Sequence, residues 1–287
     1  MDYAFVSTQM IPQDNSTLNT TSIRSAPKVK LNGIAFPTEH GAWGMVFEPI
    51  VAALAVAFSV GGLWVAVAFV GAFLMRQPLR VLMAERAAGR KLPQGAAARR
   101  FFGIYTAVFL AGAAGSAIFV EWKSFVPLVL AAPLALIQIY FDSARQSRRL
   151  APELAGAVAI SSSAAVIALA AGWRAELAVS LWIIMICRSV PSIFYVRERL
   201  LLEKRKAYSY FPPVILSVAA VFATAGLAMY RLSPWLVVLM MIVLAVRAAL
   251  GLSRFSKRRK AMQIGVFEVI FGTLTVLAIV LGYYLHL

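Results

Sequence analysis

Long apolar stretches, separated by short polar gaps, run through the chain from about residue 42 to its end. A stretch of about 18 to 22 apolar residues is long enough to cross the hydrocarbon core of a bilayer as an α-helix. The sequence therefore predicts an all-α membrane protein with nine transmembrane helices. Their expected ranges are 42–60, 63–83, 101–120, 124–142, 152–172, 178–196, 210–229, 233–252 and 264–285.

Basic residues are concentrated in every second gap between these stretches. The gaps after the second, fourth, sixth and eighth expected helices are strongly basic, as in the run at 257–260, and each of the other gaps holds at most one Lys or Arg. Because basic loops stay in the cytoplasm, this alternation places the N-terminus inside and the C-terminus outside.

Composition excludes two other classes of protein. A chain that is 61% hydrophobic has too little polar surface to cover a water-soluble globule. The net charge of +16 would suggest a nucleic-acid partner in a soluble protein. Here the basic residues form a cytoplasmic rim that faces membrane lipids, so we expect no nucleic-acid partner.

The first 36 residues differ from the rest, because they are polar and rich in Ser, Thr and Asn. We expect residues 1–36 to form a disordered cytoplasmic tail and residues 37–287 to form one transmembrane domain. Cys187 is the only cysteine, so the chain has no intramolecular disulfide and no cysteine-based metal cage.

Ionisable residues inside the apolar stretches gather in the predicted cytoplasmic half, where each is costly unless it is paired or hydrated. Arg76 and Arg80 are four residues apart and so share one helix face. Arg188 lies deep in the sixth stretch. We expect these arginines, with Glu85 and Glu198, to line a cytoplasm-facing cavity that binds a ligand. The alternative is that they anchor the helices by reaching the headgroups or pairing with carboxylates and backbone carbonyls.

Glu39 and His40 stand at the start of the first expected helix. A histidine beside a carboxylate could perform acid–base chemistry or contact a ligand, so these two residues are the catalytic candidates. The alternative is an interfacial helix cap in which Thr38 is the N-cap. The only other histidine, His286, lies on the predicted outer side, so a histidine-rich metal site is not expected.

Three segments resemble the YwiC-like family of bacterial membrane proteins, and the likeness extends over about residues 35–287. These segments are Glu39-His40-Gly41-Ala42-Trp43, Arg76-Gln77-Pro78-Leu79 and Gly265-Val266-Phe267-Glu268.

The layout is also similar to that of the UbiA superfamily of intramembrane prenyltransferases. That resemblance implies a nine-helix bundle around a cytoplasm-facing cavity. The stretch from Tyr140 and Arg145 to Pro152, Glu153 and Gly156 resembles the superfamily's fourth and fifth helices, which adds Arg145 to the ligand-binding candidates.

The two Asp-rich motifs that hold Mg²⁺ on a prenyl diphosphate in the superfamily are missing here. Their places retain Glu85 in one case and Glu198 with Glu203 in the other. We therefore expect at most weak Mg²⁺ binding and no defined metal site, because Mg²⁺ is usually held by carboxylates and substrate oxygens. Guanidinium groups can instead bind a diphosphate directly.

Three functions are compatible with these observations. The first is a repurposed relative of the prenyltransferases that binds an anionic lipid or isoprenoid. The second is an active prenyl or lipid transferase in which arginines stabilise the leaving group. The third is a transporter or membrane accessory subunit, although no inverted repeat is evident in the sequence.

Overall fold

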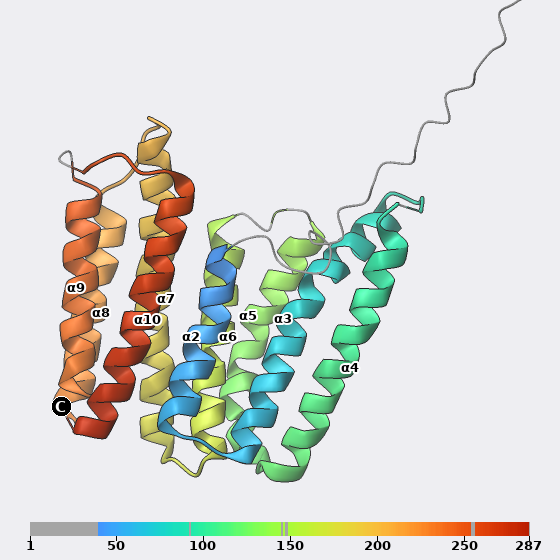
Figure 1. Cartoon of the computed structure of the whole chain (residues 1–287), viewed down its shortest axis with the longest axis horizontal. Helices are drawn as coiled ribbons and strands as arrows, with labels where there is room; N and C mark the ends of the chain where they lie inside the picture. The colour runs from blue at the N-terminus through green and yellow to red at the C-terminus, as the bar shows by residue number, and fades with distance from the viewer. Residues whose placement is uncertain (1–39, 92, 145, 147–148, 254–255, 287) are drawn as a thin grey trace, which may run out of the picture.

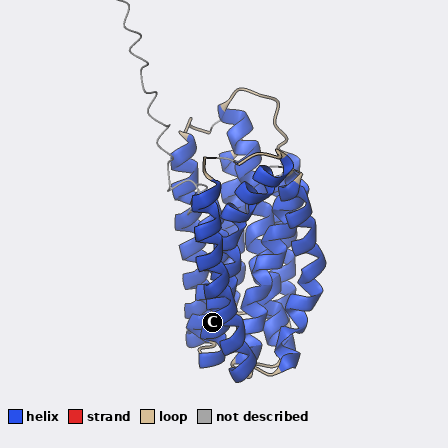
Figure 2. Cartoon of the chain, turned by 90° about the vertical axis from the view of Figure 1, so that its right-hand side faces the viewer, coloured by secondary structure: helices blue, strands red, loops and turns tan. Residues whose placement is uncertain are grey.

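The computed structural model describes residues 40–91, 93–144, 146, 149–253 and 256–286. These residues form nine α-helices and one short 3₁₀ turn, and they contain no β-strand. The helices run side by side in one elongated bundle, as Figure 1 and Figure 2 show. The helices are α2 (His40–Val56), α3 (Val60–Ala87), α4 (Gly95–Phe119), η1 (Trp122–Phe125), α5 (Val126–Ser143), α6 (Leu150–Ala170), α7 (Ala175–Glu203), α8 (Phe211–Met229), α9 (Trp235–Gly251) and α10 (Ala261–Leu285).

Each predicted apolar stretch coincides with a helix, but not every helix has the length of a full span. Seven helical segments are long and apolar enough to cross a membrane, whereas the apolar parts of α2 (Trp43–Val56) and α9 (Trp235–Gly251) are shorter. A helix of 17 residues, such as α9, is at the lower limit for spanning a bilayer. The sequence thus predicted nine spans, of which seven are supported by length and composition.

Helix ends follow local sequence signals. The Ser59 hydroxyl accepts a hydrogen bond from the Gly62 backbone N–H at 2.9 Å and so caps the start of α3. Gly172, with a φ of +81°, makes the turn between α6 and α7, where a side chain would be strained. Pro234 precedes α9 and cannot continue the preceding helix.

The helices form two groups that meet along α2, α6, α7 and α10. Helices α2 to α6 lie together, and α7 to α10 form the other group (Figure 1). The groups meet where α6 packs on α7 and α2 packs on α10. The centre of α6 is buried from Ser161 to Ala168, and its Ala and Ser side chains allow neighbouring helices to approach closely.

The outer surface of the bundle is apolar. Large hydrophobic side chains project from α4, α5, α8 and α10, and examples are Ile118, Leu130, Phe222 and Leu277. Such a continuous apolar exterior is typical of helices that face lipid. The basic gaps all join helix ends on the side of the bundle opposite to the C-terminus (Figure 1). The long apolar helices indicate an integral membrane protein.

The boundaries of two long helices correct the sequence-based expectation. The sixth stretch was expected to end at residue 196, but α7 continues to Glu203 and therefore includes Glu198 and Arg199. Similarly, α3 continues to Ala87 and includes Glu85. The reason is that these charged residues make contacts within the bundle, so the helices do not end where the apolar run ends.

Candidate functional site

A pocket of about 840 Å³ lies between the two helix groups. This volume is in the range of sites that bind small molecules, which is about 300–1,000 Å³. Apolar side chains from α2, α3, α6, α7 and α10 form much of its lining, among them Met45, Phe73, Ile160 and Val269. Its charged lining residues are Glu48, Arg76, Arg80, Glu153, Arg188, Arg197 and Glu268.

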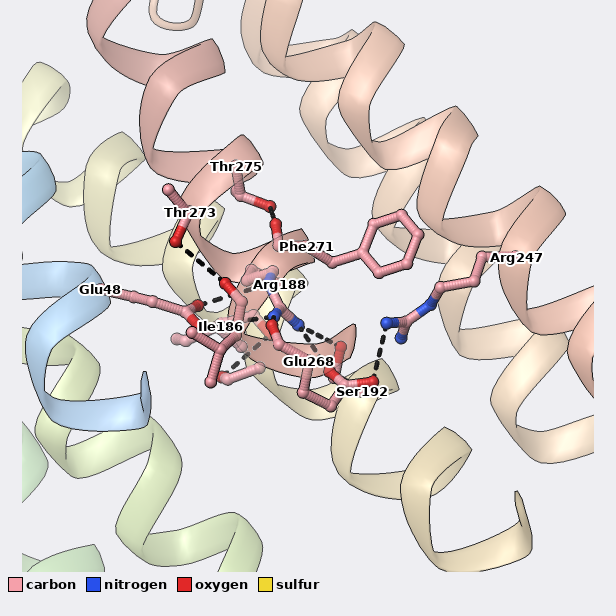
Figure 3. Close-up of polar contacts among 11 residues, drawn as sticks. Glu48, Ile186, Arg188, Ser192, Arg247, Glu268, Phe271, Thr273 and Thr275 are labelled. Atoms are coloured by element: carbon pink, nitrogen blue, oxygen red, sulfur yellow. Dashed lines mark hydrogen bonds and ion pairs between the residues drawn. The ribbon is translucent and has the colours of Figure 1, made fainter. Parts of the chain in front are cut away.

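Arg188 of α7 is the most buried of these charged side chains, with 3% of its side chain exposed. Its Nε lies 3.3 Å from Oε2 of Glu48 on α2. Its Nη1 lies 3.5 Å from Oε2 of Glu268 on α10 and donates to the Ser192 hydroxyl one turn later in α7. Its Nη2 donates to the Glu268 backbone carbonyl at 3.1 Å. Arg188 thus joins three helices at the meeting of the two groups (Figure 3).

Arg247 of α9 completes this arrangement. Its Nη1 lies 2.7 Å from Oε1 of Glu268. Its guanidinium carbon lies 4.3 Å from the centre of the Tyr195 ring and 4.6 Å from that of Phe271, both within the range of cation–π attraction. We call Glu48, Arg188, Arg247 and Glu268 the ion cluster. It contains two cations and two anions, so its formal charge is zero.

Two glycines make room for the Glu48 carboxylate. A Cβ atom at Gly272 of α10 would lie 1.8 Å from Glu48 Oε1, and one at Gly44 would lie 3.1 Å from the same atom. Any side chain at position 272 would therefore displace the carboxylate. The cluster depends on a close approach of α2 to α10 as well as on its charged residues.

The ion cluster lies well inside the ends of its helices. Glu268 is seven residues after the start of α10, and Glu48 is eight residues after the start of α2. At a rise of about 1.5 Å per residue these positions are roughly 10–12 Å along their helices. The buried charges therefore lie in the half of the bundle that carries the basic gaps.

Arg76 of α3 forms a second buried contact at the pocket. Its Nε donates to Asp142 Oδ2 of α5 at 2.6 Å and its Nη2 donates to Oδ1 at 3.1 Å. With its amide turned toward the guanidinium, the Gln138 oxygen accepts from Arg76 Nη1 at 3.1 Å. This bidentate pairing fixes one edge of the Arg76 guanidinium against α5.

Arg80 and Arg197 line the same pocket from opposite helix groups. Arg197 of α7 pairs with Glu153 of α6 at 2.6 Å, and both side chains are more than a third exposed. This ion pair therefore lies at the pocket in a position that solvent can reach. Arg76, Arg188 and Arg197 each pair with a carboxylate. The charged lining residues are four arginines and three glutamates, so positive and negative groups are nearly balanced.

The structure thus brings together three of the residues predicted to bind a ligand. Arg76, Arg80 and Arg188 all line the pocket. Their role in ligand binding remains a prediction, as does the opening of the pocket toward the cytoplasm.

Glu85 and Glu198 lie outside the pocket lining. Glu85 pairs with Arg99 of α4 at 3.0 Å, and Glu198 accepts a hydrogen bond from the Ser209 backbone N–H at 2.6 Å. Arg145 and Glu39 lie outside the described residues. Helix α2 begins at His40, whose side chain is also outside what the structure describes.

Several polar residues at the pocket or nearby were missed as site residues. Glu48, Arg247 and Glu268 are among the ionisable residues that the sequence places in the cytoplasmic half, but they were not chosen as ligand-binding candidates. Arg197 and Glu153 gave no such signal, because both stand near the ends of apolar runs.

Arg199 was expected in a basic loop, yet its side chain is only 2% exposed. It donates to the Gly251 carbonyl, the Ser256 hydroxyl and the Lys257 carbonyl, and it pairs with Glu203 at 2.7 Å. Arg199 therefore holds the end of α9 and the chain that follows it against α7.

No group of three or more His, Cys, Asp or Glu side chains suited to a metal ion is present within the described part of the chain. Glu85 and Glu198, the two carboxylates considered for weak Mg²⁺ binding, each contact another residue.

Residues 36–168 match the model of a family described as YwiC-like protein. The match covers α2 to α5 and nearly all of α6, and so includes Glu48, Arg76 and Arg80 but neither Arg188 nor Glu268. A search of curated proteins found no match to the chain. No solved structure is similar to it either.

Proposed function

We propose that this chain is a multi-pass membrane protein of the YwiC-like family that binds an anionic lipid or isoprenoid in the pocket between its two helix groups. The supporting observation is that one pocket combines Arg76, Arg80, Arg188 and Arg197 with a long apolar lining. An amphiphile with a phosphorylated headgroup matches both parts, because guanidinium groups bind phosphate and apolar side chains accept its chain.

The arginines divide into two kinds with respect to such a ligand. The side chains of Arg76 and Arg197 are 31% and 37% exposed, so a headgroup that enters the pocket can reach them. Arg188 is almost completely buried at the inner end of the same pocket, so a headgroup contacts it only by replacing one of its present partners. We therefore assign the headgroup to the region between α3 and α7, and the chain to the apolar residues of α2, α6 and α10.

The proposed orientation has the basic gaps and the N-terminus in the cytoplasm of a bacterial inner membrane, with the pocket in the cytoplasmic half. A distant relationship to the UbiA prenyltransferases is part of the proposal and supplies the isoprenoid as one ligand class. The proposal is restricted to binding of the ligand, because binding is what the lining of the pocket supports.

Native mass spectrometry of the purified protein tests this function. We expect co-purified lipid with a phosphorylated headgroup, and saturable binding of added farnesyl diphosphate or phosphatidylglycerol, which distinguishes an isoprenoid from a phospholipid. Arg80→Gln should weaken binding by about tenfold or more, corresponding to the loss of about 1.5–3 kcal/mol for a hydrogen bond to a charged group.

Arg258→Gln is the matched control, because Arg258 is exposed and lies outside the pocket. Equal binding by the wild type and both variants, or binding that never saturates, would contradict the proposed site.

A further inference from the structure

We propose that Glu48 takes up a proton when an anionic headgroup binds at Arg188. This inference rests on the proposed function and adds a coupling between ligand and proton to it. The proton moves from the aqueous phase to the Glu48 carboxylate, and no covalent bond of the ligand is broken.

The charge balance of the ion cluster is the reason to expect proton uptake when an anion binds. With two guanidinium groups and two carboxylates, it is neutral without a ligand. Glu48, Arg188 and Glu268 all line the pocket, whereas Arg247 does not. A bound anion would therefore meet a region whose positive charge is already compensated. Uptake of one proton by a carboxylate restores the balance.

The contacts of the two carboxylates differ, and this difference selects Glu48. Glu268 has a short contact of 2.7 Å to Arg247, so it keeps a cation if Arg188 turns toward a ligand. Within the described part of the chain, Glu48 forms an ion pair with Arg188 alone, at 3.3 and 3.4 Å. Loss of that contact would leave Glu48 as a buried carboxylate without a cation, which is strongly unfavourable.

The geometry of Arg188 makes this exchange possible. Nη2 donates to Glu48 at 3.4 Å and to the Glu268 backbone carbonyl at 3.1 Å, and Nη1 faces Glu268 and Ser192. Nε lies 3.3 Å from Glu48 but has no hydrogen-bond partner among the described residues, so the edge of Nε and Nη2 has donor capacity left for a ligand. A phosphate or diphosphate binds the two nitrogens of such an edge in the same bidentate way as a carboxylate. The headgroup and the ionised Glu48 therefore compete for the same donors.

The other charged groups around Glu48 do not remove the need for a proton. Glu268 on α10 adds a second negative charge beside Glu48 and so supplies no compensating cation. Arg247 on α9 is already paired with Glu268. Across the pocket, α6 contributes Glu153, which pairs with Arg197. Helix α3 contributes two arginines, Arg76, which pairs with Asp142, and Arg80.

Binding should therefore strengthen as the pH falls. Uptake of one proton per ligand gives up to about a tenfold gain in affinity for each pH unit over the range in which Glu48 is ionised without ligand and protonated with it. The Glu48→Gln variant, which is neutral at every pH, should bind at high pH more tightly than the wild type and should lose most of this dependence.

The experiment is isothermal titration calorimetry of the full-length protein with soluble short-chain phosphatidylglycerol, repeated at several pH values between about pH 5 and pH 8, because the pH dependence of binding reports linked proton uptake. The phosphodiester keeps one negative charge over this range, so the probe does not titrate. Repeating each titration in buffers of different ionisation enthalpy counts the protons taken up. Farnesyl diphosphate serves as the second probe. Because the diphosphate itself takes up protons in this pH range, its titration into Glu48→Gln measures the protonation of the probe and is subtracted.

Glu176→Gln is the matched control, because Glu176 is exposed at the start of α7 and pairs with the exposed Arg174. It should show the wild-type proton uptake. Saturable binding to the wild type without proton uptake would overturn the coupling and leave the proposed function standing. Absence of saturable binding of either probe at every pH would overturn the proposed function itself. If Glu48→Gln does not fold, the number of protons taken up by the wild type with phosphatidylglycerol decides whether ligand binding is coupled to proton uptake.

Discussion

The Glu48 carboxylate lies 3.3 Å from Nε of Arg188, although 140 positions separate the two residues in the chain. The contact fixes α2 of the first helix group against α7 of the second. Glu268 lies on the other side of the same guanidinium. Arg188 is therefore a structural partner of two carboxylates as well as a lining residue of the pocket.

The first prediction concerns the stability of this cluster. Arg188→Gln leaves two buried carboxylates with one guanidinium, so it should lower the free energy of unfolding by about 3–5 kcal/mol. An unpaired intramembrane arginine would behave differently, because its removal would relieve desolvation and be neutral or stabilising. Thermal denaturation in detergent measures the effect, with Arg258→Gln as the control that should behave as wild type.

A double variant separates charge from packing at this position. If the loss in Arg188→Gln comes from the unpaired Glu48, adding Glu48→Gln should recover part of it. Additive destabilisation by the two substitutions would show that the contact contributes no coupling energy.

The second prediction uses two glycines of α10. Gly272→Ala places a Cβ atom 1.8 Å from the present position of Glu48 Oε1 and should lower stability by about 1–3 kcal/mol. Gly265→Ala is the matched control on the same helix, because nothing lies within 4 Å of its added Cβ. It should be neutral or stabilising, since alanine favours a helix over glycine by about 1 kcal/mol. Equal melting temperatures for the two variants would mean that α2 does not approach α10 as closely as described.

The third prediction concerns the pair of Arg76 and Asp142. Asp142 has 5% of its side chain exposed and accepts two hydrogen bonds from Arg76. A double-mutant cycle with Arg76→Gln and Asp142→Asn should give a coupling energy of about 1–3 kcal/mol in thermal unfolding. The same cycle on Arg174 and Glu176, which are both largely exposed, should give no resolvable coupling.

The positions of the helices could be predicted from the sequence, but their partners could not. Each helix is a long apolar run, and this property is local. The ends of α3 and α7 were misjudged, because residues such as Arg199 are buried by hydrogen bonds to a distant loop and so extend a helix beyond its apolar run. Such contacts depend on the packing of helices and leave no periodic signal.

In the candidate site, too, the charged residues could be predicted from the sequence but their contacts could not. Arg76, Arg80 and Arg188 were identified because charged residues in apolar stretches are costly and therefore informative. The pairing of Arg188 with Glu48 and Glu268 depends on which helix faces meet, which one sequence does not determine. The sequence offered pairing with carboxylates as an alternative for these arginines, but it did not identify Glu48 and Glu268 as the partners of Arg188.

The fourth prediction concerns metal ions. If guanidinium groups bind the headgroup, EDTA should change the affinity for farnesyl diphosphate by less than threefold, and added salt should weaken binding only moderately because the pocket is partly shielded. Titration with and without Mg²⁺ measures this. A gain of about tenfold with Mg²⁺, equivalent to about 1.4 kcal/mol, would instead indicate a metal-assisted site that includes Glu85 or Glu198.

The fifth prediction concerns topology. Reporter fusions at Ser209, in the basic gap between α7 and α8, should lie in the cytoplasm, and fusions at Arg231, between α8 and α9, should lie outside. Fusions that report the same side would show that α8 does not cross the membrane and would remove the argument for a pocket that opens to the cytoplasm.

Photolabelling tests the central claim most directly. A photoactivatable analogue of farnesyl diphosphate or phosphatidylglycerol, with its reactive group on the apolar chain, is cross-linked to the protein in membranes and the labelled peptides are identified. We predict labelling of pocket residues such as Phe73, Ile160 and Val269, abolished by excess unlabelled ligand. Labelling confined to the lipid-facing surface, at residues such as Ile118 and Phe222, and unaffected by competitor, would contradict the assignment of the pocket as a binding site.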